Sequence, residues 1–243
     1  IYHKIVRVAG IGESWLAEKI EAWEKALPPY IKLAYLPTYS DLKLRLTAFG
    51  DNRLELIAEV DQQIDNLLPL IREYHYGFGE DSLEVVIGKM LRESGKKLVV
   101  AESCTGGYLG HKITSVPGSS DYYQGGVIAY NNSIKIQLLG VQPEILEEHG
   151  AVSEQTVTAM AQGVLNLFDT DYALATSGIA GPDGGTEEKP VGTIWIACAE
   201  RYGQVITKKL QLTREREANI RITAIAALHM LYQRLPKTSG INH

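Results

Sequence analysis

The residues best placed for chemistry follow a short apolar run near the middle of the chain. Residues 98–101 are apolar and uncharged, which predicts a strand buried on both faces. Over residues 108–113 apolar residues recur at helical spacing. Ser103, Cys104 and Thr105 therefore fall at the start of a helix, where free backbone N–H groups and the helix dipole stabilise a developing oxyanion. A nucleophile at Ser103 would lie beside its own oxyanion hole. The same pattern also fits an ordinary strand, turn and helix with a Ser or Thr cap.

A second polar cluster follows the next expected strand. Residues 125–130 predict that strand, and residues 131–135 begin a helix directly after it. In an open α/β sheet, functional groups gather beyond the carboxyl ends of the strands. We therefore expect Tyr130 and Lys135 to face Ser103 if their strands are neighbours. Taken alone, Lys135 would be an ordinary solvated surface lysine.

Two loops have the composition of ligand-binding loops. One contains Gly118, Ser119 and Ser120, whose hydroxyl and backbone donors could bind a phosphate, although Pro-Gly-Ser-Ser is also an ordinary turn. A strand at 171–176 leads into residues 177–186, of which five of ten are Gly or Pro. Such small residues permit close approach of the backbone to a ligand, and a surface excursion would use them too.

The last helix, expected from residue 215 to residue 235, carries a charge on its buried side. Apolar residues from 225 to 235 form a stripe, and Arg221 continues that stripe toward the helix start. An inward charge needs an anionic partner. That partner is either an internal carboxylate or a bound ligand.

Length and composition favour two globular domains and exclude several classes of protein. The 243 residues are 45% hydrophobic, enough for two cores. A net charge of −5 argues against a general nucleic-acid binder, because phosphate contacts need a basic face. No apolar run approaches the roughly 20 residues that span a bilayer, and no signal peptide precedes the first strand, so we expect a cytoplasmic protein. Cys104, Cys198 and the six histidines lack metal-ligand spacing, and neither metal nor cofactor is expected.

The first 80 residues predict a small α+β domain. The expected elements are strand 3–9, helix 13–26, strand 31–36, strand 42–49 and helix 54–68. This order is similar to that of KH-like domains, some of which bind single-stranded RNA. Nine Lys or Arg stand against twelve Asp or Glu in residues 1–80, a net of −3, which favours a packing or dimerising module over RNA binding.

The boundary between the domains is expected in residues 74–81, where glycines, aromatics and acids suggest a linker. We predict a KH-like α+β domain over residues 1–80 and an α/β domain over residues 81–243. In the second domain we expect a mixed sheet covered by helices, because a hairpin of strands 193–199 and 204–212 follows the earlier strands.

Six segments of the second domain together form a family pattern. They are Ala101-Glu-Ser-Cys-Thr-Gly-Gly107, Pro117-Gly-Ser-Ser120, Tyr130 with Lys135, His149-Gly-Ala-Val-Ser-Glu154, Ser177-Gly-Ile-Ala-Gly-Pro-Asp-Gly-Gly185 and Lys189-Pro-Val-Gly-Thr193. Over residues 82–235 the chain resembles the carboxyl-terminal domain of the CinA family (competence/damage-inducible protein), found alone in bacteria as nicotinamide mononucleotide deamidase. The first 80 residues are similar to that family's KH-like middle domain, through Gly10-Ile-Gly-Glu-Ser14 and Tyr35-Leu-Pro37. The family's amino-terminal molybdopterin-binding-like domain, with its pyrophosphatase activity on ADP-ribose, is not expected here.

The resemblance implies hydrolysis of the carboxamide of nicotinamide mononucleotide to nicotinate mononucleotide and ammonia. It implies Ser103 as the nucleophile and Lys135 as its general base, with Tyr130 supporting the pair and Arg221 reaching the site from the last helix. For Lys135 to act as a base, its pKa must fall from about 10.4 to about 7 to 8, and burial or a nearby cation such as Arg221 would lower it. The expected substrate contacts are Thr105, Gly106, Gly118, Ser119, Ser120, Thr176, Ser177, Gly178 and Gly181.

Two alternatives stay open at the level of sequence. Cys104 with Glu102 and Lys135 could form a Cys-Glu-Lys amidase arrangement, although we favour the serine. The chain could instead be a non-catalytic interaction module in DNA uptake or damage response.

As partners we expect the nucleotide substrate and, from the resemblance and from exposed sheet edges, a second copy in a homodimer. Nucleic acid and membranes are not expected.

Overall fold

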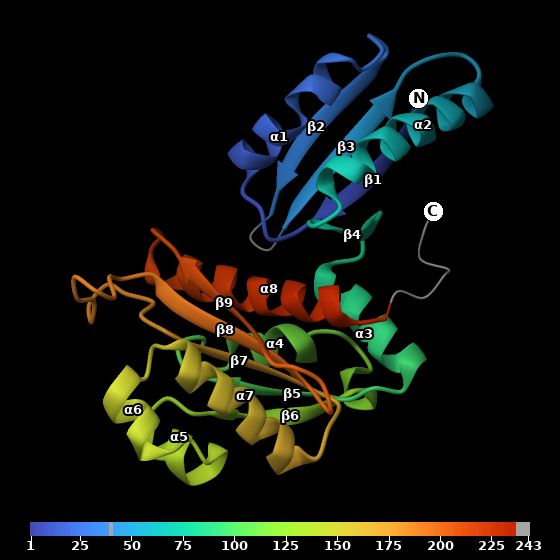
Figure 1. Ribbon diagram of the computed structural model, residues 1–243. Coiled ribbons are helices and arrows are strands. Elements are labelled where there is room, and N and C mark those ends of the chain that lie inside the picture. The colour runs from blue at the N-terminus through green and yellow to red at the C-terminus, as the bar shows by residue number, and fades with distance from the viewer. Residues whose placement is uncertain (39–40, 237–243) are drawn as a thin grey trace. The chain divides into compact units, whose positions relative to one another are not determined.

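A computed structural model describes residues 1–38 and 41–236 of the chain (Figure 1). Within this part the chain forms two compact units, unit 1 with Ile1–Val86 and unit 2 with Ile87–Pro236. The division falls inside helix α3 (Leu83–Ser94). Residues 237–243 of the expected second domain lie outside the described residues.

Unit 1 is an antiparallel sheet with two helices on one face. Its elements are β1 (Tyr2–Val8), α1 (Glu13–Lys25), β2 (Ile31–Pro37), β3 (Leu42–Ala48), α2 (Arg53–Ile71) and β4 (His75–Phe78). The strands pair in the order β2-β3-β1-β4. Leu42, Leu44 and Leu46 enter the core from alternate positions of β3, as a half-buried strand requires. The expected small α+β unit is confirmed.

The segment expected as a linker contributes a strand. β4 pairs antiparallel with β1, with Val6 opposite Phe78 and Arg7 opposite Gly77. Four residues are too few for an alternation of apolar and polar side chains to stand out, and Gly77 has no side chain to mark a face. Tertiary pairing, not local pattern, makes this segment a strand.

Unit 2 is built around a mixed sheet. Its elements after α3 are β5 (Leu98–Glu102), α4 (Tyr108–Thr114), η1 (Ser119–Asp121), β6 (Tyr123–Ile128), α5 (Asn132–Leu139), α6 (Pro143–His149), α7 (Glu154–Phe168), β7 (Tyr172–Gly178), β8 (Thr193–Glu200), β9 (Ile206–Gln211) and α8 (Arg216–Arg234). The sheet order is β6-β5-β7-β8-β9, with β5 parallel to β6 and β7 and the remaining pairs antiparallel. The expected α/β fold with a mixed sheet is confirmed.

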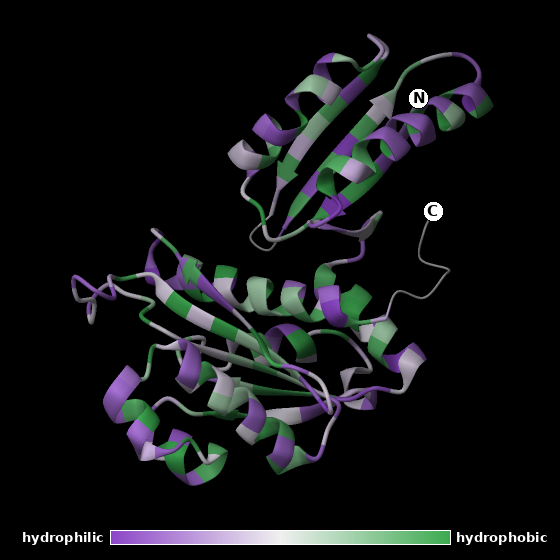
Figure 2. Ribbon diagram, viewed as in Figure 1, coloured by the Kyte–Doolittle hydropathy of each residue, from purple (hydrophilic) through white to green (hydrophobic). Residues whose placement is uncertain are grey.

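Helices cover both faces of this sheet (Figure 1). α7 packs on β5, β7 and β8 and buries Val157 and Met160, whereas α8 packs on β7 and β8 from the other face and buries Ala224 and Leu228. Hydrophobic and hydrophilic residues alternate along both helices, as amphipathic helices on a sheet require (Figure 2). Neither α8 nor any other helix in the described part of the chain has the length and apolar character to cross a membrane.

The parallel strands bring three chain segments to one edge of the sheet. Glu102, the last residue of β5, is in register with Ile128, the last residue of β6, and with Thr176 near the end of β7. The turns after β5 and β6 therefore meet the end of β7 at the carboxyl edge. The strands that Ser103 and Tyr130 follow, β5 and β6, are neighbours, which is the condition set by the sequence for the two clusters to face each other.

Candidate active site

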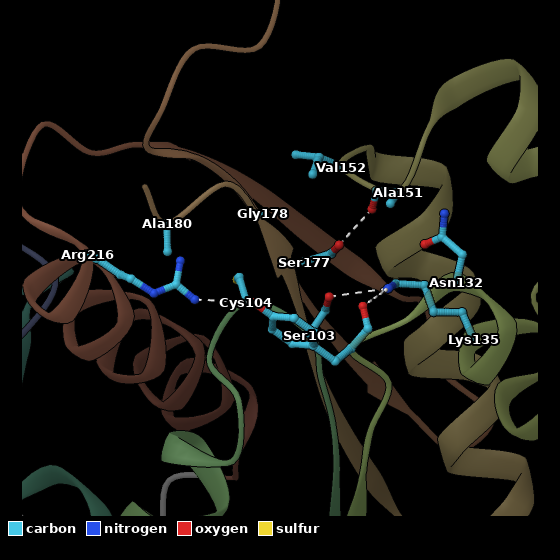
Figure 3. A pocket seen from close by; sticks show the side chains of 11 residues that line it. Ser103, Cys104, Asn132, Lys135, Ala151, Val152, Ser177, Gly178, Ala180 and Arg216 are labelled. Atoms are coloured by element: carbon cyan, nitrogen blue, oxygen red, sulfur yellow. Dashed lines mark hydrogen bonds between the residues drawn. The ribbon is translucent and has the colours of Figure 1, made fainter. Parts of the chain in front are cut away.

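Lys135 is buried beside Ser103 at the carboxyl edge of the sheet (Figure 3). Its Nζ lies 3.2 Å from Ser103 Oγ. The same nitrogen donates to the carbonyl oxygens of Ala129, at 2.8 Å, and of Tyr130, at 3.4 Å. Lys135 is only 1% exposed and Ser103 8% exposed. The two residues that the sequence predicts to face each other are thus in contact, with the amine held by backbone carbonyls.

Helix α5 places Lys135 at its start. Asn131 caps the helix, because its side-chain oxygen accepts the N–H of Ser133 at 2.9 Å. Side chains on a helix lean toward its amino terminus. From the first turn of α5, Lys135 therefore leans back over the preceding turn and toward the end of β5.

Burial lowers the pKa of Lys135, and the neighbouring Cys104 thiol, which acts in the opposite direction, does not reverse this shift. The three groups that contact the amine are a hydroxyl and two carbonyls, all neutral. A buried ammonium without a carboxylate partner is poorly stabilised, which favours the neutral amine. Lys135 can therefore accept a proton at a lower pH than an ordinary lysine.

Cys104 lacks the properties of a nucleophile. Burial, aided by the charge of Glu102, raises the pKa of its thiol to about 12, so the thiol stays protonated near neutral pH. The Glu102 carboxylate in turn is occupied by backbone N–H groups. The Cys-Glu-Lys alternative therefore has neither a thiolate nor a free carboxylate.

The helix that follows the nucleophile is α4, which begins at Tyr108, five residues after Ser103. The Glu102 carboxylate accepts the first N–H groups there, from Gly107 at 2.9 Å, Leu109 at 3.0 Å and Gly110 at 2.7 Å. The expectation that the start of this helix forms the oxyanion hole is wrong, because a carboxylate already fills those hydrogen-bonding positions.

Two other backbone donors remain next to the nucleophile. The N–H groups of Cys104 and Thr105 donate to no backbone carbonyl within residues 1–38 and 41–236. They directly follow Ser103 in a turn, a position from which backbone donors can receive a developing oxyanion.

A cavity of about 200 Å³ opens beside the Ser103 hydroxyl (Figure 3). It is lined by Ser103, Cys104, Tyr130, Asn132, Lys135, Ala151, Val152, Ser177, Gly178, Ala180 and Arg216. The Ser177 hydroxyl donates to the carbonyl of Ala151 at 2.6 Å and so ties one wall of the cavity to β7. In the described ranges, no group of His, Cys, Asp and Glu side chains could hold a metal ion.

Arg216, the first residue of α8, supplies the cationic group of this cavity. Its Nη1 donates to the carbonyl of Gly181 at 2.7 Å, and its Nη2 donates to the Tyr130 hydroxyl at 3.2 Å. Tyr130 is 62% exposed, so its ring and the guanidinium form the solvent side of the cavity. Sequence reasoning missed Arg216, which lies outside the apolar stripe of its helix and leaves no periodic signal.

Arg221, expected in the site, does not line the cavity. Five residues further along a helix correspond to a rotation of about 140° from Arg216. The Arg221 side chain is 30% exposed and its Nη2 pairs with Glu217 at 2.5 Å. The helix thus brings a different arginine to the cavity from the one the sequence stripe indicated.

Three of the expected substrate contacts lie in or beside the nucleophile's turn and do not line the cavity. The hydroxyls of Thr105 and Thr176 are buried and 2.7 Å apart, so they bond to each other across the two strands. Gly106 has a φ of 58° and lies in the exposed part of the turn. These residues shape the turn that carries Ser103.

The expected contacts after β7 divide into two groups. Ser177 and Gly178 line the cavity. A Cβ at Gly178 would lie 2.5 Å from a side-chain carbon of Ile194 and 2.8 Å from its Cα, so only glycine fits there against β8. Gly181 does not line the cavity but accepts the hydrogen bond from Arg216.

Gly118, Ser119 and Ser120 lie at the opposite edge of the sheet. η1 directly precedes β6, whose first residue Tyr123 is in register with Leu98 at the start of β5. The length of β5, five residues or about 16 Å, separates that edge from the nucleophile. Contrary to the expectation, these residues are not placed to bind a ligand in the cavity of the same chain.

Family comparison decides where the chain belongs. Residues 80–235 match the family model of the CinA C-terminal domain, and residues 3–77 match that of the damage-inducible protein CinA KH domain. The chain belongs to the CinA family. The resemblance expected for both parts of the chain is therefore confirmed.

Related proteins agree with this assignment. The CinA-like protein of Cytophaga hutchinsonii is 53% identical over 235 residues, which are 97% of this chain and 56% of that protein. The CinA-like protein of Amoebophilus asiaticus is 46% identical over 234 residues, 96% of this chain and 56% of that protein. The chain thus spans 56% of the length of these two CinA relatives.

A solved CinA structure matches one part of the chain. The crystal structure of competence/damage inducible protein CihA from Agrobacterium tumefaciens is 38% identical, with a TM-score of 0.61. The match covers 62% of this chain and 92% of that one. A second structure, the competence damage-inducible protein A from Klebsiella pneumoniae, is 36% identical with a TM-score of 0.61 and covers 63% of this chain and 94% of its own.

Proposed function

We propose that this CinA chain hydrolyses the carboxamide of nicotinamide mononucleotide to nicotinate mononucleotide and ammonia. The observation that carries the proposal is the buried Lys135 amine, 3.2 Å from Ser103 Oγ, with a lowered pKa and with no carboxylate bonded to it in the part of the chain that the structure describes. A serine hydroxyl needs a base to attack an amide near neutral pH, and a positioned base contributes about 10²- to 10⁴-fold. Membership of the CinA family agrees with an amidase, because the domain it matches resembles the stand-alone deamidase.

The first half of the reaction forms an acyl-enzyme. Neutral Lys135 takes the proton of Ser103 Oγ, and the oxygen attacks the carboxamide carbon. The tetrahedral oxyanion is received by the N–H groups of Cys104 and Thr105, and one such donor is worth about 3 to 4 kcal/mol. Lys135 then returns its proton to the amide nitrogen, the C–N bond breaks, and ammonia leaves.

The second half releases the acid. Lys135, neutral again, takes a proton from water, and the hydroxide attacks the Ser103 ester. The oxyanion is held by the same two donors, Lys135 reprotonates Ser103 Oγ, and the carboxylic acid leaves and ionises in water. Both halves use the same groups, which are Ser103, Lys135 and the N–H groups of Cys104 and Thr105.

The size and charge of the cavity fit a substrate with two unlike ends. At about 200 Å³ it is smaller than the roughly 300–1,000 Å³ sites that enclose drug-sized ligands. We therefore propose that it takes the carboxamide and its ring, while the ribose phosphate extends past Tyr130. Arg216 then faces the phosphate from the solvent side, where a guanidinium can bind it through two N–H groups.

The proposal is tested by incubating purified protein with nicotinamide mononucleotide and measuring ammonia and nicotinate mononucleotide. Equal amounts of the two products, formed in proportion to protein and time, would support it. A folded protein that forms neither product would refute the amidase and leave the interaction module. The expected homodimer is a separate proposal, tested by measuring the mass of the chain in solution.

A further inference from the structure

Glu102 connects the strand before the nucleophile to the helix after it. It is the last residue of β5 and 1% exposed. One carboxylate oxygen accepts the N–H groups of Gly107 and Leu109, and the other accepts that of Gly110. A buried carboxylate is stable when such charge-assisted bonds replace its water. The mechanism proposed above gives this carboxylate no chemical step.

The turn between the end of β5 and the start of α4 carries Ser103. On the strand side, the N–H of Ser103 donates to the carbonyl of Thr176 at 2.9 Å. On the helix side, Gly107 has a φ of 99° and supplies no side-chain cap to α4. Without Glu102, the first N–H groups of α4 would lack acceptors, and unsatisfied buried donors cost stability and order.

We propose that Glu102 is a positioning residue, whose carboxylate holds the turn so that Ser103 Oγ meets Lys135 and the N–H groups of Cys104 and Thr105 stay free. The carboxylate does this by occupying the competing donors at the start of α4. For its kinetic readout this inference rests on the proposed amidase function. The reacting groups must be held within a fraction of an ångström, and a misplacement of about 1 Å costs about 10²-fold in rate.

Glu102→Gln is the sharpest substitution, because it keeps size and shape while replacing the charged carboxylate with a neutral amide, as the Asp171→Asn control also does. A glutamine offers one carbonyl oxygen and an NH₂ group, so at least one of the three N–H groups would face another donor. We expect kcat for nicotinamide mononucleotide to fall about 10- to 100-fold with little change in KM.

Asp171→Asn is the matched control. The Asp171 carboxylate likewise accepts a backbone N–H, that of Lys97 at 2.8 Å, and it bonds Lys96 Nζ at 2.8 Å. These contacts lie at the other end of β5, far from Ser103. We expect this variant to lose thermal stability and to keep the wild-type kcat. An equal loss of kcat in both variants would mean that Glu102 acts only through overall stability and would overturn the proposal.

A second readout does not depend on the natural substrate. A fluorophosphonate that modifies active serines is reacted with each variant, and the rate of adduct formation on Ser103 is followed by intact mass. The Glu102→Gln rate should fall by a similar factor, and a wild-type rate would overturn the proposal. If the wild type is labelled but releases no ammonia, the proposed amidase function is refuted. The labelling rates still test whether Glu102 positions Ser103.

Hydrogen exchange of the wild-type protein covers the case in which the variant does not fold or the probe does not react. The amides of Gly107, Leu109 and Gly110 should be protected as strongly as those in the middle of α4. Exchange as fast as in the exposed loops would contradict the contacts on which the inference stands.

Discussion

The guanidinium of Arg216 and the phenol of Tyr130 meet at the solvent side of the cavity, where Nη2 lies 3.2 Å from the hydroxyl. They come from the start of α8 and the turn after β6, segments separated by more than a third of the chain. This contact places a cation opposite the buried lysine, with the cavity between them. A substrate with an amide at one end and an anion at the other matches that arrangement.

Arg216→Ala should therefore raise KM for nicotinamide mononucleotide about tenfold or more, because a charge-assisted contact of about 1.5 to 3 kcal/mol is lost. The matched control is Arg221→Ala, on the same helix but outside the cavity, which should leave KM near the wild-type value. Nicotinamide riboside, which has no phosphate, sharpens the test. If Arg216→Ala weakens turnover of the riboside as much as that of the nucleotide, the arginine does not bind the phosphate.

Ser103→Ala should abolish ammonia release, whereas Cys104→Ala should retain most of it. The reason is that the Cys104 thiol has a pKa of about 12 and stays protonated, while the Ser103 hydroxyl lies 3.2 Å from a base. Rates of ammonia release and treatment with a thiol alkylator measure the difference. Loss of activity in the Cys104 variant alone would show that the Cys104 thiol is the nucleophile.

The pH dependence of kcat/KM should report the pKa of Lys135. Burial lowers the pKa of Lys135 below its ordinary value of 10.5, so kcat/KM should rise with pH through that lowered pKa and then level off. Lys135→Met should lose about 10²- to 10⁴-fold in rate together with this limb of the profile. Lys208→Met, at an exposed site on β9, is the control. A limb at the ordinary lysine value would speak against a buried base.

The free energy of unfolding should also depend on the protonation of Lys135, and this contribution should rise with pH. Between the lowered pKa in the native state and 10.5 in the unfolded state, the unfolded chain binds more protons at Lys135. Stability contributed by this group therefore rises with pH across that window and is lowest below it. Lys135→Met should remove this slope, so the difference in melting temperature between variant and wild type should favour the variant most at lower pH.

Unit 1 contains a buried ion pair whose loss should be costly. The Arg7 and Asp41 side chains are 4% and 2% exposed and bond to each other and to Tyr76. Removing one partner leaves an uncompensated buried charge, so Arg7→Ala should cost about 3 to 5 kcal/mol in unit 1. Arg45→Ala, at an exposed position of the neighbouring strand β3, should cost well under 1 kcal/mol. Urea unfolding followed by probes specific to unit 1 would show equal losses if the pair were unimportant.

Much of the site could be predicted because its main parts are local. An apolar run followed by small polar residues marks Ser103 at the end of a strand, and the same pattern marks Tyr130 and Lys135 after the next. Parallel strands end at one edge, so both clusters could be expected there. The register of Glu102 with Ile128 and Thr176 satisfies the condition that the strands be neighbours.

Other parts could not be predicted, because they depend on contacts between distant segments. Gly118, Ser119 and Ser120 have a suitable composition for phosphate, but the pairing of Tyr123 with Leu98 puts them at the far edge. The choice of Arg216 over Arg221 depends on which face of α8 turns toward the cavity.

The sequence by itself determined most of the elements and their order, the family, and the positions of Ser103 after one strand and of Lys135 in the helix after the next, because hydrophobic periodicity and turn residues act over a few neighbours. Only the tertiary structure decided that Glu102 occupies the helix start and that Lys135 is buried against a hydroxyl and two carbonyls. Those outcomes depend on strand register and on the exclusion of water, which no local segment encodes.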